Sequence, residues 1–118
     1  MPHATPMRLA AILAGAVGLG GTAMAADSIS LTLKDHHFVP SEVTAPANTR
    51  FRIDVVNQDT TPAEFESSDL RVEKIVVPGG RIIVRAGPLK PGKYAFFDDY
   101  NPDQAKGTLT AVATPAGK

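Results

Sequence analysis

The side chains in this 118-residue sequence that best suit binding chemistry are carboxylates in two short segments and one histidine, His36. Glu64 and Glu66 are two positions apart, so both side chains lie on the same face of an extended strand. Asp98 and Asp99 directly follow an aromatic segment. Carboxylates with an imidazole suit hard or borderline ions such as iron, Mn²⁺ or Cu²⁺ rather than Cu⁺. Clustered carboxylates also need a cation or a proton between them, because like charges repel at short distance.

Each of these residues also has a simpler interpretation. The two glutamates fit the solvated face of a strand, and the two aspartates fit a turn after a strand, where Asp is favoured. His36 is followed by His37, and in an extended chain the two imidazoles point to opposite faces. At most one of them can therefore enter a given site, and a surface or hydrogen-bonded histidine is the alternative.

The elements that must position these residues are short strands. Apolar and polar residues alternate over residues 28–34 and 50–57, which is typical of half-buried strands. The alternation breaks at residues 35–37, because the next large apolar residue, Phe38, has the opposite parity; a bulge or an irregular turn is expected there. Further strands are expected at 42–45, 63–66, 71–77, 81–86, 93–97 and 107–113. Seven or eight short strands with frequent turn signals predict an all-β sandwich.

The N-terminal segment has the pattern of an export signal. Met7-Arg8 gives a positive start, residues 9–21 are apolar without an acid, and Ala23-Met24-Ala25 fits the small-x-small cleavage rule. The apolar run is too short to span a bilayer permanently, and a membrane anchor or a buried helix is the alternative interpretation. We predict a signal peptide at residues 1–25, one domain at residues 26–118, and a periplasmic location without a membrane span after processing.

Charge and composition exclude several functional classes. The formal net charge is +0, which argues against a nucleic-acid partner, because such a partner calls for a basic surface. The chain has no cysteine, so it can form no thiolate nucleophile, no zinc–thiolate site and no type 1 copper centre. No serine has an evident partnership with a histidine and an acid, so the residues alone predict no enzyme mechanism.

Several motifs taken together resemble the cupredoxins. The framework Gly92-x-Tyr94-x-Phe96, a polar loop and then Gly107-x-Leu109 looks like the last hairpin of that fold. The likeness covers nearly the whole chain after the predicted signal peptide. It is closest to a cysteine-free subgroup, the EfeO-type cupredoxin-like domains, which are periplasmic proteins found with bacterial iron-uptake permeases. The motifs of this subgroup are Asp35-His36-x-Phe38-x-Pro40, Thr61-Pro62-x-Glu64-Phe65-Glu66-Ser67, Gly87-Pro88-Leu89-Lys90-Pro91-Gly92-x-Tyr94 and Ala105-Lys106-Gly107.

The resemblance implies a single Greek-key β-sandwich and a metal site near one end of it. The implied ligands are Glu64, Glu66, Asp98, Asp99 and His36, and the implied ion is iron or copper. A ferroxidase activity is implied by the resemblance only, and it needs a redox metal or partner that the sequence does not reveal.

The sequence departs from the blue-copper members at every ligand position. By alignment with those members, the cysteine position is Asp98, the histidine of the same loop is Asn101, the methionine lies near Ala105 or Lys106, and the first histidine lies near Ala63 or Glu64. Relatives of the EfeO type often keep a histidine at the position of Asn101, and this chain does not.

Two functions are therefore expected. The first is a periplasmic protein that binds iron or copper and serves iron transport beside an inner-membrane permease or another iron-uptake component. The second is a metal-free interaction module that docks onto a permease or another periplasmic protein, with the acidic loop as its contact surface.

Overall fold

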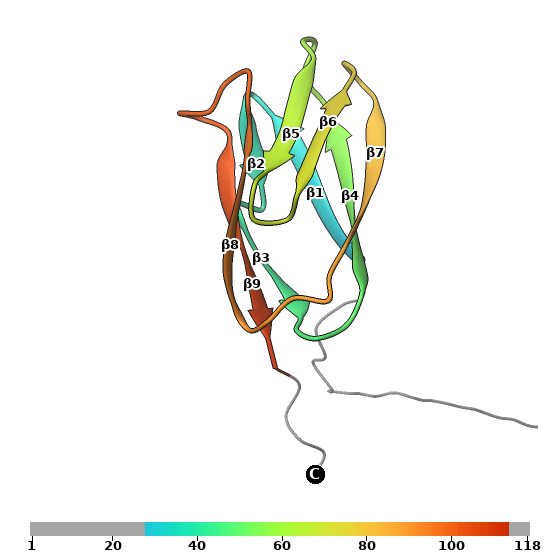
Figure 1. Ribbon diagram of the computed structural model, residues 1–118. Coiled ribbons are helices and arrows are strands. Elements are labelled where there is room, and N and C mark those ends of the chain that lie inside the picture. The colour runs from blue at the N-terminus through green and yellow to red at the C-terminus, as the bar shows by residue number, and fades with distance from the viewer. Residues whose placement is uncertain (1–27, 114–118) are drawn as a thin grey trace, which may run out of the picture.

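The computed structural model describes residues 28–113, which form nine strands in two facing sheets (Figure 1). The predicted signal peptide lies outside the described residues. The four-stranded sheet has the order β2 (His37–Val39), β1 (Ser28–Lys34), β4 (Phe51–Asn57) and β7 (Arg81–Ala86). The five-stranded sheet has the order β3 (Glu42–Pro46), β9 (Lys106–Val112), β8 (Gly92–Asp98), β5 (Ala63–Ser67) and β6 (Val72–Val76). The predicted all-β sandwich is confirmed.

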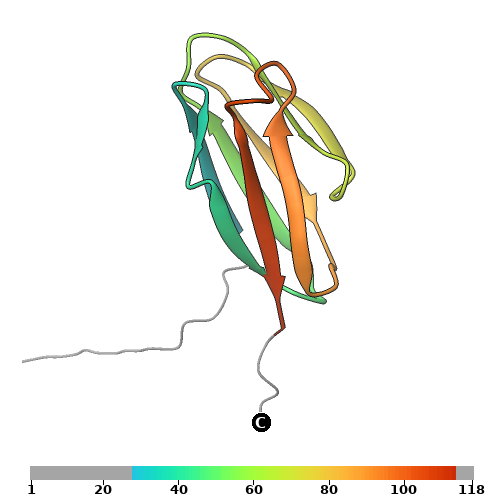
Figure 2. The same ribbon diagram turned by 90° about the vertical axis from the view of Figure 1, so that its left-hand side faces the viewer.

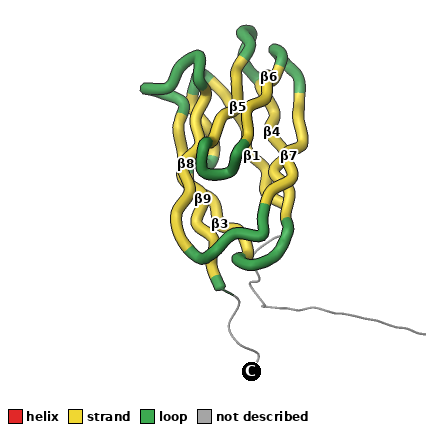
Figure 3. Tube along the Cα trace, in the orientation of Figure 1, coloured by secondary structure: helices red, strands yellow, loops and turns green. Residues whose placement is uncertain are grey.

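Only strands and loops make up the part of the chain that the structure describes (Figure 3). Within residues 28–113, no helix is long and apolar enough to cross a membrane. Two strand pairs are parallel, β1 with β4 and β3 with β9, and the other pairs are antiparallel. The chain passes from one sheet to the other several times, which ties the two sheets into one unit.

The expected number of seven or eight strands is wrong by one, because β2 is an additional three-residue strand. The break in alternation after β1 is a two-residue hairpin turn at Asp35 and His36, which have φ angles of 52° and 61°. Asp and His tolerate this left-handed region better than most residues. The carboxylate of Asp59 accepts hydrogen bonds from both turn amides, over 2.6 Å from Asp35 and 2.9 Å from His36. After the turn, Phe38 pairs with Leu33 and both side chains are buried.

The core lies between the sheets and contains a cluster of three aromatic rings. Phe38 comes from the four-stranded sheet, and Phe65 and Phe96 come from the five-stranded sheet. Their ring centroids are 5.2 to 5.9 Å apart, and Phe38 meets both partners edge to face. Such contacts add about 0.5–1.5 kcal/mol per pair beyond the burial of apolar area. The cluster fixes how β5 and β8 sit relative to the opposite sheet.

Four of the connections between strands gather at one end of the sandwich. The turn after β1 and the β4–β5, β6–β7 and β8–β9 loops lie at one end in both views (Figures 1 and 2). The first and last described residues lie toward the other end. The candidate residues on β5 and after β8 therefore come together at the end that carries the four loops.

Candidate metal centre

Three carboxylates meet on the outer face of the five-stranded sheet. One oxygen from each of Glu64, Glu66 and Asp99 lies within 4.8 Å of the others. The two glutamates are half-buried, and Asp99 is exposed. We call these three residues the carboxylate cluster. Within residues 28–113, it is the only group of three or more His, Asp or Glu side chains with this spacing.

The alternation of β5 places both glutamates on the same face. Ala63, Phe65 and Ser67 are buried between the sheets, so Glu64 and Glu66 must point outwards. The neighbouring strand β8 brings the third carboxylate alongside them. Phe65 pairs with the last residue of β8, and the backbone N–H of Asp99 donates to the carbonyl of Glu64 over 2.9 Å. Backbone hydrogen bonding therefore fixes the start of the β8–β9 loop against β5.

A fourth acid, Glu73, lies beside the carboxylate cluster and is not among the ligands predicted from the sequence. It lies on β6, directly opposite Glu66 in the antiparallel β5–β6 pair. Its side chain is close enough to the carboxyl group of Glu64 to raise the proton affinity of that group. The alternation of β6 predicts that Glu73 lies on the outer face. Which residue of β5 lies opposite Glu73 depends on the register of the β5–β6 hairpin, which the alternation does not give.

The crowding of acids changes the proton affinity of the two glutamates. Partial burial, the neighbouring carboxyl group of Glu73, and the charges of Asp99 and Glu66 raise the pKa of Glu64 from 4.5 to about 6. Partial burial, together with the charges of Asp99 and Glu73, also raises the pKa of Glu66. The site therefore favours an added positive charge, which a proton supplies at low pH and a metal ion can supply at neutral pH.

Asp98 faces the opposite side of the sheet from the carboxylate cluster. It is fully buried, with an exposed fraction of 0%. Its Oδ1 atom accepts hydrogen bonds from the backbone N–H groups of Glu64 (2.9 Å) and Tyr100 (3.0 Å), and its Oδ2 atom accepts one from Asn101 Nδ2 at 3.4 Å. Both oxygens are thus engaged within the protein. The alternation from Phe96, which is buried, already indicates that Asp98 points inwards and Asp99 outwards.

His36 lies in the hairpin turn after β1, outside the carboxylate cluster. Its Nδ1 atom is 3.7 Å from Oδ2 of Asp59, the residue that also holds the backbone of the turn. His37 places its Nδ1 atom 2.8 Å from the carbonyl oxygen of Asp35. Both histidines therefore have contacts within the turn region. The structure brings Glu64, Glu66 and Asp99 together and gives Asp98 and His36 other partners.

Three of the positions that align with blue-copper ligands, Ala63, Asp98 and Ala105, are buried, and Asn101 is half-buried. Ala63 and Ala105 are apolar and have exposed fractions of 2% and 0%. The backbone N–H of Asp98 donates to the carbonyl of Ala105, and that of Ala105 donates to the carbonyl of Asn101, each over 2.9 Å. The hydrogen bonds of Asp98 and Asn101 hold the β8–β9 loop at the place where blue-copper proteins have their metal ligands. Without cysteine the chain can build no type 1 centre there.

Comparison with known proteins agrees with this fold. The sequence profile of the cupredoxin-like domain family matches residues 7–111. An uncharacterised protein of Rickettsia prowazekii (strain Madrid E) is 48% identical over 81 residues, which cover 69% of this chain and 65% of that protein. The chain thus spans about two thirds of the length of this relative.

Two solved structures show the same fold at low sequence identity. The reduced auracyanin of Roseiflexus castenholzii has a TM-score of 0.62 at 17% identity, covering 78% of this chain and 100% of that one. The metal-binding domain of the Cu(I)-exporting P-type ATPase CopA from Streptococcus pneumoniae D39, solved with Cu(I), has a TM-score of 0.63 at 15% identity. That match covers 72% of this chain and 84% of the other.

Proposed function

Because the chain belongs to the cupredoxin-like domain family, we propose that it is an exported metal-binding protein that carries iron or copper on the carboxylate cluster. The observation that supports this proposal is the convergence of Glu64, Glu66 and Asp99 within 4.8 Å on one sheet face. Glu73 adds a fourth acid at the edge of the cluster. Four acids held together by strand pairing and by the backbone hydrogen bond of Asp99 repel one another, and a bound cation relieves this repulsion.

The chemistry of the ligand set favours iron over Cu⁺. Carboxylate oxygens bind hard ions, whereas Cu⁺ prefers thiolate and thioether sulfur. The chain has no cysteine, and the described residues 28–113 contain no methionine. His36 supplies no imidazole to the carboxylate cluster, so Cu²⁺, which imidazole suits, is also less well matched than iron.

The proposed place of action is the bacterial periplasm, beside an iron permease of the inner membrane or another component of iron uptake. Two features of the sequence support this proposal: the signal-peptide pattern of residues 1–25 and the resemblance to EfeO-type domains. The protein would act as an accessory that binds the ion and presents it to the transport machinery.

Calorimetric titration of the purified protein with Fe²⁺ under anaerobic conditions, Mn²⁺ and Cu²⁺ tests the metal site. We expect Fe²⁺ to bind with a Kd below about 0.1 mM, the range of loose oxygen-ligand sites. Glu64→Gln, Glu66→Gln and Asp99→Asn should each weaken binding about tenfold or more. Asp103→Asn is the matched control, because Asp103 is an exposed acid of the same β8–β9 loop and lies outside the carboxylate cluster. Equal weakening by the control, or no metal ion bound with a Kd below about 0.1 mM, contradicts the proposal.

The same variants distinguish metal binding from the second function, a metal-free docking module. If the acids only contact a protein partner, Glu64→Gln should reduce partner capture while the melting temperature stays the same with and without metal. If they bind metal, the metal-induced rise in melting temperature should disappear in the variant.

A further inference from the structure

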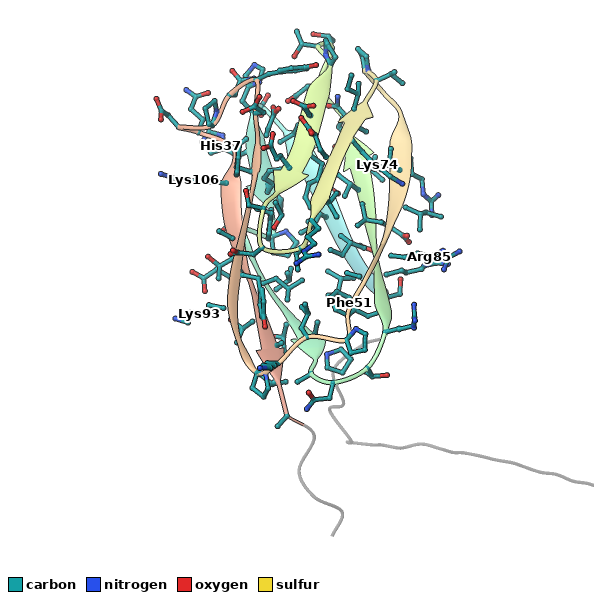
Figure 4. The ribbon with its side chains drawn as sticks, viewed as in Figure 1. His37, Phe51, Lys74, Arg85, Lys93 and Lys106 are labelled. Carbon is teal, nitrogen blue, oxygen red and sulfur yellow. The ribbon has the colours of Figure 1, made fainter. Side chains whose placement is uncertain are left out.

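Arginines gather on the outer face of the four-stranded sheet, opposite the face that carries the carboxylate cluster. Phe51, Val84 and Ala86 are buried, so the alternating residues Arg52 on β4 and Arg85 on β7 point outwards. These two arginines are direct cross-strand partners. Figure 4 shows Arg85 extending away from β7. Like charges placed directly opposite each other destabilise a sheet unless an anion lies between them.

A hollow lies at this point of the surface. It has a volume of about 260 Å³ and is lined by Arg50, Phe51, Arg52, Arg85, Ala86 and Gly87. Arg50 immediately precedes β4 and lies two positions from Arg52. Three of the six residues that line the hollow are therefore arginines.

Most of this positive charge has no counter-charge among residues 28–113. Asp54 is the acid of this face, and its Oδ2 atom lies 3.3 Å from Arg52 and 3.6 Å from Arg81. No carboxylate in the described part of the chain lies within 4.0 Å of the side-chain nitrogens of Arg50 or Arg85. Arg52 makes one further hydrogen bond, from Nε to Ser28 Oγ at 3.3 Å. Among residues 28–113, its remaining guanidinium N–H groups have no other side-chain partner.

We propose that Arg50, Arg52 and Arg85 form a binding site for a small oxyanion, either phosphate or a molecule that carries carboxylate groups. The planar fork of a guanidinium matches the oxygens of carboxylate and phosphate and binds them through two parallel hydrogen bonds. The volume of about 260 Å³ accommodates one phosphate or one small polycarboxylate.

The test uses metal-free protein and two probes, inorganic phosphate and citrate, with sodium chloride at matched ionic strength as the reference. We expect either probe to raise the melting temperature above that in chloride, because ligand binding to the folded state stabilises it. In ¹⁵N-edited NMR spectra, the amide signals of Arg52, Arg85 and Gly87 should shift with a saturable dependence on the concentration of the probe. Comparison of the affinities for phosphate and for citrate shows which of the two classes of oxyanion the site prefers.

Arg50→Gln and Arg85→Gln are the variants of choice, because neither residue has an ion pair within residues 28–113 and the fold should survive. Each should weaken binding about tenfold. Lys93→Gln removes one exposed positive charge from the other sheet and should leave binding unchanged. Equal weakening by Lys93→Gln, or no effect of 20 mM phosphate and citrate beyond that of chloride, overturns the proposal. Glu64→Gln should not alter oxyanion binding, so the outcome is independent of the proposed metal site.

Discussion

The carboxylate of Asp98 accepts a hydrogen bond from the backbone N–H of Glu64 over 2.9 Å, although the two side chains serve opposite faces of the same sheet. This contact links the buried side of β8 to the strand that carries two members of the carboxylate cluster. Asp98 also accepts from the backbone of Tyr100, so it shapes the beginning of the β8–β9 loop. Its role in the structure is to position the chain around the cluster.

Asp98→Ala should therefore destabilise the protein substantially. The substitution leaves the partly buried N–H groups of Glu64 and Tyr100 without their acceptor, and the loss of each hydrogen bond costs about 1 kcal/mol or more. The free energy of unfolding, measured by urea denaturation, should fall by at least about 2 kcal/mol. Asp103→Ala, in the exposed part of the same loop, should change it by less than about 0.5 kcal/mol. A stability like that of the unaltered protein would show that Asp98 does not hold the loop.

The stability of the metal-free protein should fall as the pH rises from 4.5 to 6. The pKa of Glu64 is about 6 in the folded protein, compared with its ordinary value of 4.5. Between these values the folded state binds more protons than the unfolded state, so the contribution of this group is complete below pH 4.5 and is lost by about pH 6. The raised pKa of Glu66 acts in the same direction.

Unfolding by urea at several pH values between 4 and 7, in buffer freed of metal, measures this dependence. Glu64→Gln should flatten the decline, because the amide does not titrate. Asp103→Asn should leave it unchanged. A decline of the same steepness in Glu64→Gln would assign the pH dependence to other groups.

Gly107→Ala should destabilise the β8–β9 pair. A methyl group at this position would collide with the ring of Phe96 and with the carbonyl oxygen of Ser41. Phe96 belongs to the aromatic cluster of the core, and overpacking of this kind costs about 1–3 kcal/mol. The free energy of unfolding of Gly107→Ala measures this cost.

Gly79→Ala is the comparison for that variant, because a methyl group there meets nothing within 4 Å and only the positive φ of 71° opposes it. Its cost should be about 1 kcal/mol, the strain of a left-handed residue. A smaller loss for Gly107→Ala than for Gly79→Ala would mean that the contact with Phe96 relaxes easily.

Asp59→Ala should loosen the turn between β1 and β2. Asp59 accepts from the backbone N–H groups of Asp35 and His36, both of which have positive φ angles. Without the carboxylate, the amide hydrogens of these two residues should exchange with solvent at least tenfold faster, as NMR hydrogen exchange can measure. Exchange at buried Leu31 should change far less. Unchanged protection of the two turn amides would show that the turn is stable without Asp59.

Much of the fold could be predicted from alternation alone. Ile29, Leu31 and Leu33 on β1, and Phe51, Ile53 and Val55 on β4, are buried as their spacing predicts. The three residues of β2 could not be predicted as a strand, because only Phe38 among them is buried and three residues define no period. The left-handed turn before it depends on Asp59, which is 23 residues away from His36 in the sequence.

The candidate site was predictable only in part. The spacing of Glu64 and Glu66 correctly predicted that both lie on one face, whereas Asp98 and Asp99 were both predicted as ligands of the same site. The two aspartates lie on opposite faces of the sheet. The alternation from the buried Phe96, two residues before Asp98, indicates this arrangement. Glu73 reaches the cluster through the register of the β5–β6 hairpin, which is set by the turn at residues 68–71 and by tertiary packing.

The position of the carboxylate cluster on an open sheet face has a kinetic consequence. An ion ligated there by Glu64, Glu66 and Asp99 would have protein on one side only, and water would complete its coordination shell on the other. Water ligands are replaced readily, and a competing chelator can approach from the open side without any loop having to move. Such an ion would exchange rapidly, which suits cargo passed from one protein to another better than a permanently retained redox centre.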